Sequence, residues 1–289
     1  MEIWILLNPI IKFFLYIAVF GSVGTLVFIS HFYKLLTPAQ LDDCSKIKNK
    51  FTKVGVLVSF ISILSIPGNM SGDLMGIIDI NMINLSFDTL ALKSSLLLFT
   101  GFILIYYLPT KFKKIFFWGS TTAVFIILFA FIAIGHSTKG GVLTQALIII
   151  HLIGLSYWIG ALLPLKGMCN IPDFKELKTV AHMFGKYAIY YILALLTAGL
   201  IFSYILIGDI STLFNTMYGN VLIIKFLFAI LLISLGALNK LFLVPKLDIN
   251  NGISIRKLKR SINVEMIIVL IIFFLTSLLT TSLTLPMSD

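Results

Sequence analysis

Long runs of apolar residues recur along the whole chain, separated by short polar segments. Each run is continuously apolar and lacks the alternation of a half-buried strand. About 20 such residues form a helix long enough to cross the hydrocarbon core of a bilayer. The pattern predicts eight spans, at about residues 9–32, 51–68, 88–108, 115–135, 143–165, 183–207, 219–243 and 260–284. We therefore expect an all-α polytopic membrane protein, an eight-helix bundle that forms one transmembrane domain over residues 1–289.

The first two spans have unusual ends. The opening segment MEIWILLNPIIKFF has no basic region and no small-residue cleavage site before its apolar run continues. We interpret it as a retained first helix. The second span has the shortest clean apolar run, from Val54 to Ile66. We expect Pro67-Gly68 to stop this helix, because proline lacks the amide donor that a helix interior uses.

Basic residues are distributed very unequally between the two faces of the predicted bundle. The connections after spans 1, 3, 5 and 7 hold 18 of the 22: Lys34, Lys46, Lys48, Lys50, Lys53, Lys111, Lys113, Lys114, Lys166, Lys175, Lys178, Lys186, Lys240, Lys246, Arg256, Lys257, Lys259 and Arg260. The opposite connections hold only Lys139, and Lys12, Lys93 and Lys225 fall inside spans. Lys and Arg accumulate on the cytoplasmic side of membrane proteins. Both termini are therefore expected on the outer side.

Composition excludes several classes of function. The chain is 59% hydrophobic and 12% charged, with a mean hydropathy of +1.05, whereas a soluble domain carries about 25% charged residues. The net charge of +10 follows the topology, so we expect a lipid environment and no nucleic-acid partner. No nucleotide-binding motif is present. No nucleophile–base pair or paired carboxylates occur within a span, so we do not expect an enzyme. Cys44 and Cys169 are isolated, without the spacing of a metal site.

Four polar residues inside or at the ends of spans are candidates for a structural or pathway role, because ionisable groups in a membrane are costly. Lys93 and Lys225 lie in the outer parts of spans 3 and 7, where a long side chain can also reach the headgroups. Glu265 lies near the cytoplasmic end of span 8. Basic residues around Arg260, or Asn239 at the foot of span 7, could satisfy its carboxylate.

Two histidines lie on the outer half of the predicted bundle. His136 ends span 4, and His151 lies about 12 Å deep in span 5. An imidazole at that depth needs a partner, which can be a helix–helix hydrogen bond, a metal or water. Trp158 follows two turns later on the same face, next to the small residues Gly154 and Ala161. We therefore expect this face of span 5 to point into the bundle.

The other two histidines and the methionines complete the candidate chemistry. His31 and His182 are predicted at the cytoplasmic surface as interfacial side chains. Met70, Met75 and Met82 follow one another in the first outer connection. Thioether and imidazole together suit copper, Cu(I) above all, although methionine also fills apolar gaps.

Several segments resemble the copper resistance D family (CopD/PcoD). They are GHS at residues 135–137, HLIGLSYWIGALLPL from His151, YGNVLIIKFLFAILLISLGALNKLFLVPKL from Tyr218, and LKRSINVEMIIVLIIFFLTSLLTTSLTLP from Leu258. The similarity extends from about residue 87 to residue 286. Lys93 replaces an arginine of the family, and Ala161 replaces the second glycine of its Trp-x-Gly-Gly pattern.

The resemblance implies an eight-span protein of the bacterial inner membrane that imports copper, Cu(I) or Cu(II), from the periplasm as its substrate. It also implies a periplasmic copper-binding partner of the CopC type, with no organic cofactor. The candidate copper ligands are His136 and His151, with Met70, Met75 and Met82 as weaker additions. Two alternatives stay open: a haem b electron-transfer protein, and a non-transporting scaffold for metallating an oxidase.

Overall fold

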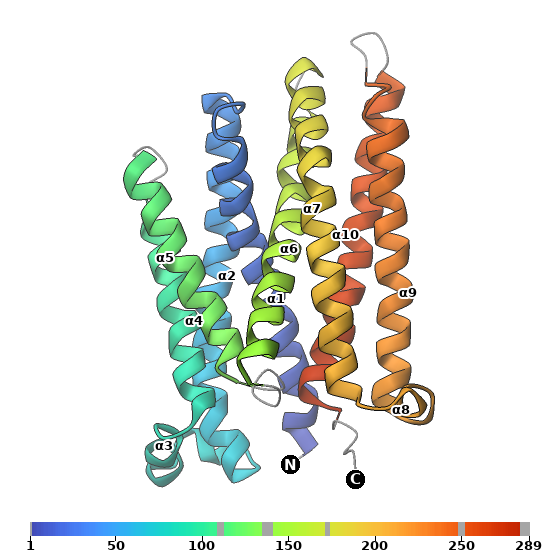
Figure 1. The fold of residues 1–289 in the computed structure, drawn as a ribbon. Coiled ribbons are helices and arrows are strands. Elements are labelled where there is room, and N and C mark those ends of the chain that lie inside the picture. The colour runs from blue at the N-terminus through green and yellow to red at the C-terminus, as the bar shows by residue number, and fades with distance from the viewer. Residues whose placement is uncertain (1, 109–112, 135–140, 171–173, 248–251, 284–289) are drawn as a thin grey trace.

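The computed structural model describes residues 2–108, 113–134, 141–170, 174–247 and 252–283. The described residues are almost entirely helical, and eight of the helices are long and apolar enough to cross a membrane. These eight are α1 (Glu2–Phe32), α2 (Pro38–Ser71), α4 (Leu90–Tyr107), α5 (Lys113–Ile132), α6 (Gly141–Met168), α7 (Phe174–Ile207), α9 (Met217–Leu238) and α10 (Gly252–Thr281). The predicted all-α membrane bundle is confirmed (Figure 1).

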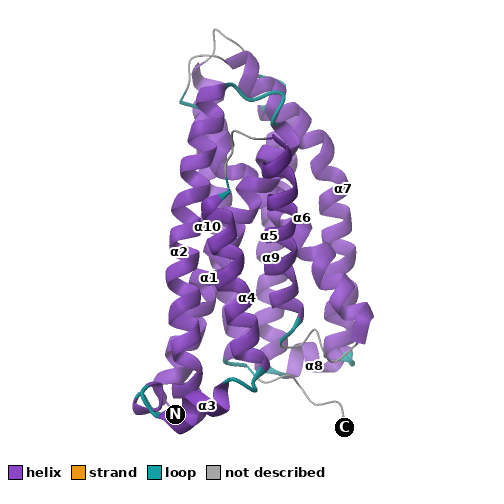
Figure 2. Cartoon of the chain, turned by 90° about the vertical axis from the view of Figure 1, so that its left-hand side faces the viewer, coloured by secondary structure: helices purple, strands orange, loops and turns teal. Residues whose placement is uncertain are grey.

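The first and last helices reach the same end of the bundle, called here the terminal end. The Ser282 hydroxyl donates to the Ile5 carbonyl, and the Tyr16 and Thr280 hydroxyls lie 3.4 Å apart. Two short helices that the apolar pattern did not predict, α3 (Ile80–Ser86) and α8 (Ile210–Asn215), lie at this end too (Figure 2). Each begins at an aspartate whose side chain accepts a backbone N–H of the first turn, as helix caps commonly do.

Helix α2 extends beyond the predicted span 51–68 at both ends. Thr37 and Gln40 form a reciprocal capping box at its start, so the charged segment that follows is helical as well. Pro67 does not stop the helix, contrary to the prediction. The helix continues to Ser71 and ends at Gly72, whose φ of 84° suits glycine. Pro67 is tolerated because membrane helices can satisfy the freed backbone groups in other ways.

Helix α1 is at the centre of the fold. It packs against α2, α6 and α10, while α4 and α5 extend the bundle beyond α2, and α7 packs on α6. At the α1–α6 crossing, a Cβ built on Gly160 would lie 2.1 Å from the Gly24 carbonyl carbon. Only glycine allows two backbones to approach this closely. Stacked rings of Tyr16, Phe20 and Phe273 then join α1 to α10.

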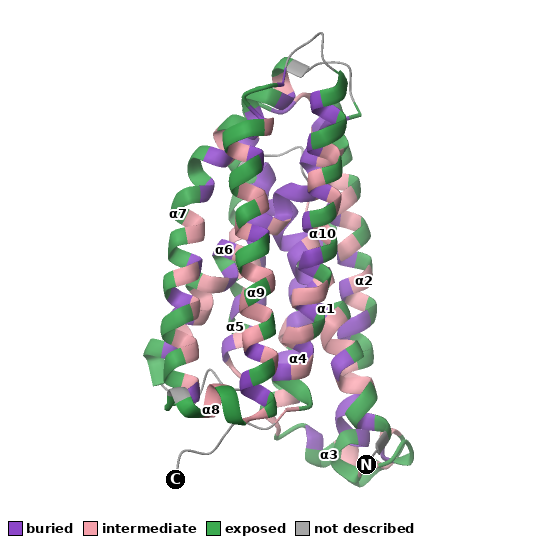
Figure 3. Cartoon of the chain, turned by 90° about the vertical axis from the view of Figure 1, so that its right-hand side faces the viewer, coloured by how far each residue is buried: buried purple, intermediate pink, exposed green. Residues whose placement is uncertain are grey.

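Helices α7 and α9 are much less covered by protein than α1. In each of them the most apolar 18-residue segment is 11% buried inside the bundle, whereas the corresponding segment of α1 is 72% buried. Figure 3 shows the contrast, with mostly exposed and half-buried residues along α7 and α9. The candidate site residues on α6 and α10 face this loosely packed side.

Candidate functional site

His151 lies on α6 and faces α7. The side chain is half-buried, and its Nδ1 lies 3.1 Å from the carbonyl oxygen of Leu195. A carbonyl oxygen only accepts, so Nδ1 carries the proton and the neutral ring keeps a lone pair on Nε2. Metal-binding histidines commonly have their second nitrogen held in this way. Among the described residues, no hydrogen-bond partner is assigned to Nε2.

Glycines on both helices make room for this contact. A Cβ on Gly154 would lie 2.8 Å from the Leu195 Cβ, and one on Gly199 would lie 3.0 Å from Nδ1 of His151. The prediction that the Gly154 face lets another helix approach closely is therefore confirmed. The role of Gly199 was not apparent in the sequence, because nothing local relates residue 199 to residue 151.

Lys225 on α9 is the charged side chain that acts electrostatically on His151. Lys225 is half-buried and forms no ion pair with any described residue. The positive charge of Lys225 disfavours a second positive charge on the imidazole ring of His151.

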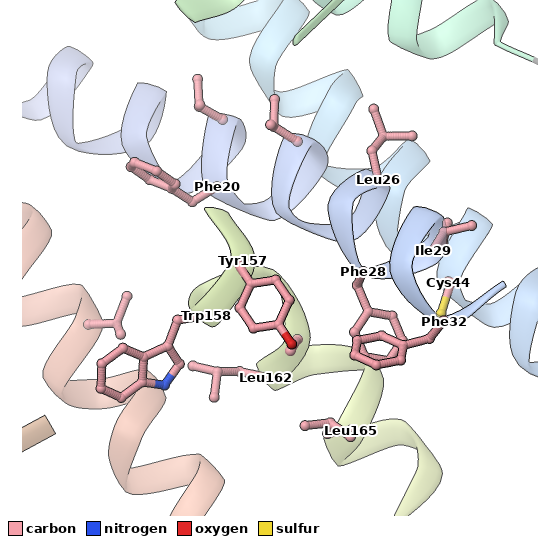
Figure 4. Close-up of a cluster of buried hydrophobic side chains, with 14 of the residues drawn as sticks. Phe20, Leu26, Phe28, Ile29, Phe32, Cys44, Tyr157, Trp158, Leu162 and Leu165 are labelled. Carbon is pink, nitrogen blue, oxygen red and sulfur yellow. The ribbon is translucent and has the colours of Figure 1, made fainter. Parts of the chain in front are cut away.

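A buried polar cluster lies two helical turns further along α6 than His151. It consists of Trp158 on α6, Asn239 at the end of α9 and Glu265 on α10. Trp158 is 4% exposed and Glu265 is 2% exposed. The indole Nε1–H donates to Oε2 of Glu265 at 3.2 Å, and the amide of Asn239 donates to Oε1. The inward direction predicted for Trp158 is confirmed. Of the two kinds of partner considered for Glu265, the structure shows Asn239 and no ion pair with a described basic residue. Figure 4 shows Trp158 directed toward α10, while Tyr157 leaves α6 on the side of α1.

A cavity of about 230 Å³ opens beside this cluster, between α7 and the end of α9. Its lining is mostly apolar, and its polar and charged members are Trp158, Asn239, Lys240 and Glu265. Asn239 begins a five-residue π-helix, Asn239–Leu243, in which the Val244 N–H donates to the Asn239 carbonyl. Such wide turns inside α-helices frequently occur at functional sites.

The predicted methionine ligands lie elsewhere. Met70 is exposed near the end of α2, Met75 is exposed in the short 3-10 turn Met75–Ile77, and Met82 is half-buried on α3. These elements pack against one another and against α2, on the far side of α1 from α7. His136 lies outside the described residues. The structure therefore places His151 without bringing Met70, Met75 or Met82 to it.

Lys93 and Lys12 have different surroundings from the buried cluster. Lys93 and the nearby Asp88 are both exposed and form no ion pair in the described part of the chain. The Lys12 ammonium lies over the rings of Tyr16 and Phe131, at 5.9 and 5.3 Å from their centroids. Cation–π contacts therefore hold Lys12 within the bundle.

His182 is exposed on α7, as predicted, and His31 is exposed at the end of α1. His31 also has partners that the sequence did not indicate. Its Nδ1–H donates to the Val27 carbonyl, and Nε2 accepts from the Tyr191 hydroxyl, both at 2.9 Å. The Tyr191 ring stacks on that of Tyr157, with centroids 4.1 Å apart. Nε2 of His31 thus joins α1 to α7, while Nδ1 bonds within α1.

Within the described residues, no group of three or more His, Cys, Asp or Glu side chains is arranged to hold a metal ion. Cys44 and Cys169 are buried free thiols. Burial raises the pKa of the Cys169 thiol to about 11, so this thiol stays protonated at neutral pH. Among the described histidines, His151 is the one placed within the bundle between α6 and α7, with Nε2 available to a soft metal.

Residues 178–279, which include most of α7 and all of α8, α9 and the π-helix, match the family model described as Copper resistance protein D. Over this part of the chain, 102 of 289 residues, the protein is similar to the copper resistance D family. Together with the eight apolar helices, the match supports a multi-pass membrane protein connected with copper resistance. Lys225, Asn239 and Glu265 lie within the matched region, and His151 and Trp158 precede it. Neither the curated proteins nor the solved structures contain a match to the chain.

Proposed function

We propose that this protein imports copper across the bacterial inner membrane, from the periplasm to the cytoplasm, through the side of the bundle formed by α6, α7, α9 and α10. The observation that supports this most is His151, whose Nδ1 is held by the Leu195 carbonyl while Nε2 stays available. Neutral imidazole binds copper in either oxidation state. The match to the family model described as Copper resistance protein D supports copper as the proposed substrate.

The inward direction is part of the proposal and rests on the predicted topology. His151 is nearer the terminal end, and Trp158 with the cavity lies about 10 Å further along the helix. With the terminal end in the periplasm, copper captured by His136 would next meet His151. A periplasmic copper-binding protein of the CopC type is the proposed donor. Lys225 is proposed to bind an anionic group that accompanies the ion.

Copper flux into liposomes tests the role of His151. The purified protein is reconstituted, Cu(I) is added outside, and a Cu(I)-selective dye reports its arrival inside. His151→Ala is expected to reduce flux to the level of protein-free liposomes, because it removes the one deep imidazole. His182→Ala is the matched control, since His182 is exposed on α7, and it should transport like the parent. Parent-level flux through His151→Ala would make the histidine structural and refute the proposal.

The sidedness has a separate test. The proposal requires both termini in the periplasm, as the basic residues indicate. A reporter active only in the periplasm, fused after Asp289, is expected to be active, and a reporter active only in the cytoplasm is expected to be silent. The reverse pattern would place His151 nearer the cytoplasm and overturn the proposed direction.

A further inference from the structure

Glu265 is a buried carboxyl without a cationic partner. It is 2% exposed and forms no ion pair with any described residue. Its two oxygens each accept one hydrogen bond, from Trp158 and from Asn239. A buried ionised carboxylate is costly unless a cation or a full set of hydrogen bonds compensates it. A bound proton removes that charge, so burial favours the binding of a proton by the Glu265 carboxylate.

Asn239 is suited to a carboxyl that changes its protonation state. It is 9% exposed, and its Oδ1 is buried without a hydrogen-bond partner. The amide of asparagine both donates and accepts. Its N–H donates to an ionised Glu265, and rotation of the amide presents Oδ1 to the O–H of a protonated Glu265. The unpartnered oxygen is therefore the acceptor that the protonated state uses.

The cavity gives the carboxyl a route to exchange its proton. Glu265 and Asn239 line it together with Lys240, which the π-helix places next to Asn239. The cavity lies in the half of the bundle away from the terminal end, between α7 and the end of α9. A volume of about 230 Å³ admits several waters, since one occupies about 30 Å³ of liquid.

A proton suits this site better than a metal ion. The charged and titratable residues on the helices packed against α10, and on α10 itself besides Glu265, are Glu2, Lys12, Tyr16 and His31 on α1, His151, Tyr157 and Lys166 on α6, Tyr218 and Lys225 on α9, Lys240 in the π-helix, and Arg256, Lys257, Lys259 and Arg260 on α10. Lys240 lines the cavity and disfavours a second cation there. Carboxylate and amide oxygens are also poor ligands for Cu(I). A proton needs only one of the carboxylate oxygens.

We infer that Glu265 is a proton-binding site that exchanges with the cytoplasmic side through this cavity and makes copper transport depend on cytoplasmic pH. The step is an acid–base equilibrium in which the carboxylate gains a proton from water in the cavity and later returns it. Asn239 acts as a positioning residue that bonds either form. The link to copper rests on the proposed function, whereas the proton site itself does not.

Infrared spectroscopy tests the proton site without copper. Difference spectra of the purified protein between acidic and alkaline pH are expected to show the C=O stretch of a buried carboxylic acid that titrates. Glu265→Gln should lack this band and Glu176→Gln should keep it, because Glu176 lies outside the cavity lining, at the start of α7. A band that survives in Glu265→Gln, or is absent from the parent, overturns the site.

A second variant covers the case in which Glu265→Gln does not fold. Asn239→Leu keeps the carboxyl and removes the amide that bonds both of its forms. The titration midpoint of the Glu265 band is then expected to shift from that of the parent. An unchanged midpoint in a folded Asn239→Leu protein would show that Asn239 does not serve the carboxyl, and would overturn its assignment as positioning residue.

Copper flux at varied cytoplasmic-face pH tests the coupling. The parent is expected to change its flux with this pH, and Glu265→Gln, which cannot titrate, is expected to give a flat profile. Thermal melts of both proteins check folding. If the parent protein transports no copper, the proposed function is refuted. The infrared band then still shows whether Glu265 binds a proton. A parent that moves copper while Glu265→Gln keeps the same pH profile overturns the coupling alone.

Discussion

Helices α1 and α9 are both strongly apolar but have opposite surroundings. The most apolar 18-residue segment of α1 has a mean hydropathy of 2.1, and that of α9 has a mean hydropathy of 2.7. The α1 segment is nevertheless 72% buried in protein, whereas the α9 segment is 11% buried. In a membrane, lipid and protein are equally apolar, so hydropathy does not decide which helix is central. Small residues and polar partners decide it, and they divide the bundle into two differently packed regions.

The tightly packed region is centred on α1. Gly24 meets Gly160 at backbone distance, and the rings of Tyr16, Phe20 and Phe273 stack across α1 and α10. Its buried charge, Lys48, is 1% exposed and donates to the carbonyl of Leu108 at the end of α4. A cation at a helix C-terminus is favourably placed. This partner is part of the scaffold, so the charge has no evident part in transport.

The loosely packed region is formed by α7, α9 and their contacts with α6 and α10. Its buried charge, Glu265, has hydrogen-bond donors but no cation, and it lines a cavity. The match to the copper resistance D family covers this region and not α1. The comparison therefore separates a tightly packed part that holds the bundle together from a loosely packed part through which we propose that copper passes.

Trp158 lies at the boundary of the two regions, and its removal is expected to have the largest effect on stability. Trp158→Ala should lower the free energy of unfolding by about 3–5 kcal/mol, through the cavity it leaves. The loss of its hydrogen bond to Glu265 acts in the same direction. Trp118→Ala is the matched control, because Trp118 is 68% exposed on α5. It should be nearly silent in a thermal melt. An equally silent Trp158→Ala would mean that α6 is not anchored to α10 there.

Gly160→Ala tests the tight region with a single methyl group. The added Cβ would lie 2.1 Å from the Gly24 carbonyl carbon, so the two backbones must separate, at a cost of about 1–3 kcal/mol. Gly167→Ala on the same helix is the control, since nothing lies within 4 Å of its Cβ. It should be neutral or stabilise by about 0.5–1 kcal/mol. Equal melting temperatures for the two variants would refute a rigid α1–α6 contact.

The sequence predicts the number of spans and the class of fold well, because continuous apolar runs report directly on membrane helices. It predicts helix ends poorly. The start of α2 depends on a capping box outside the membrane, at Thr37 and Gln40. The end of α2 lies beyond Pro67, because the membrane helix can accommodate a proline near its last turn.

Only part of the candidate site could be predicted from the sequence. The inward direction of Trp158 follows from the small-residue face of α6. The cost of a buried carboxylate predicts that Glu265 has a partner, but the choice of Asn239 over the basic residues around Arg260 needed the structure. The cavity, the unpartnered Oδ1 of Asn239 and the His31–Tyr191 contact depend on how helices distant in sequence cross. No local pattern contains that information, so these features needed the structure.

Gly199→Ala tests the loose region and has the smallest expected effect on stability. The added Cβ would lie 3.0 Å from Nδ1 and 3.1 Å from Cε1 of His151. The ring or α7 must therefore move by a few tenths of an ångström. Because α7 is little covered by protein, the helix can yield. Alanine also favours the helix by about 1 kcal/mol over glycine, so the melting temperature should stay close to that of the parent.

The same variant is expected to lower copper flux. Displacing the ring lengthens the hydrogen bond from Nδ1 to the Leu195 carbonyl, and that bond orients the lone pair of Nε2. Gly167→Ala, far from His151 on α6, should transport like the parent. Two results would contradict the comparison. A destabilisation as large as that of Gly160→Ala would show α7 to be as rigidly held as α1, and unchanged flux would show that the orientation of His151 does not matter for transport.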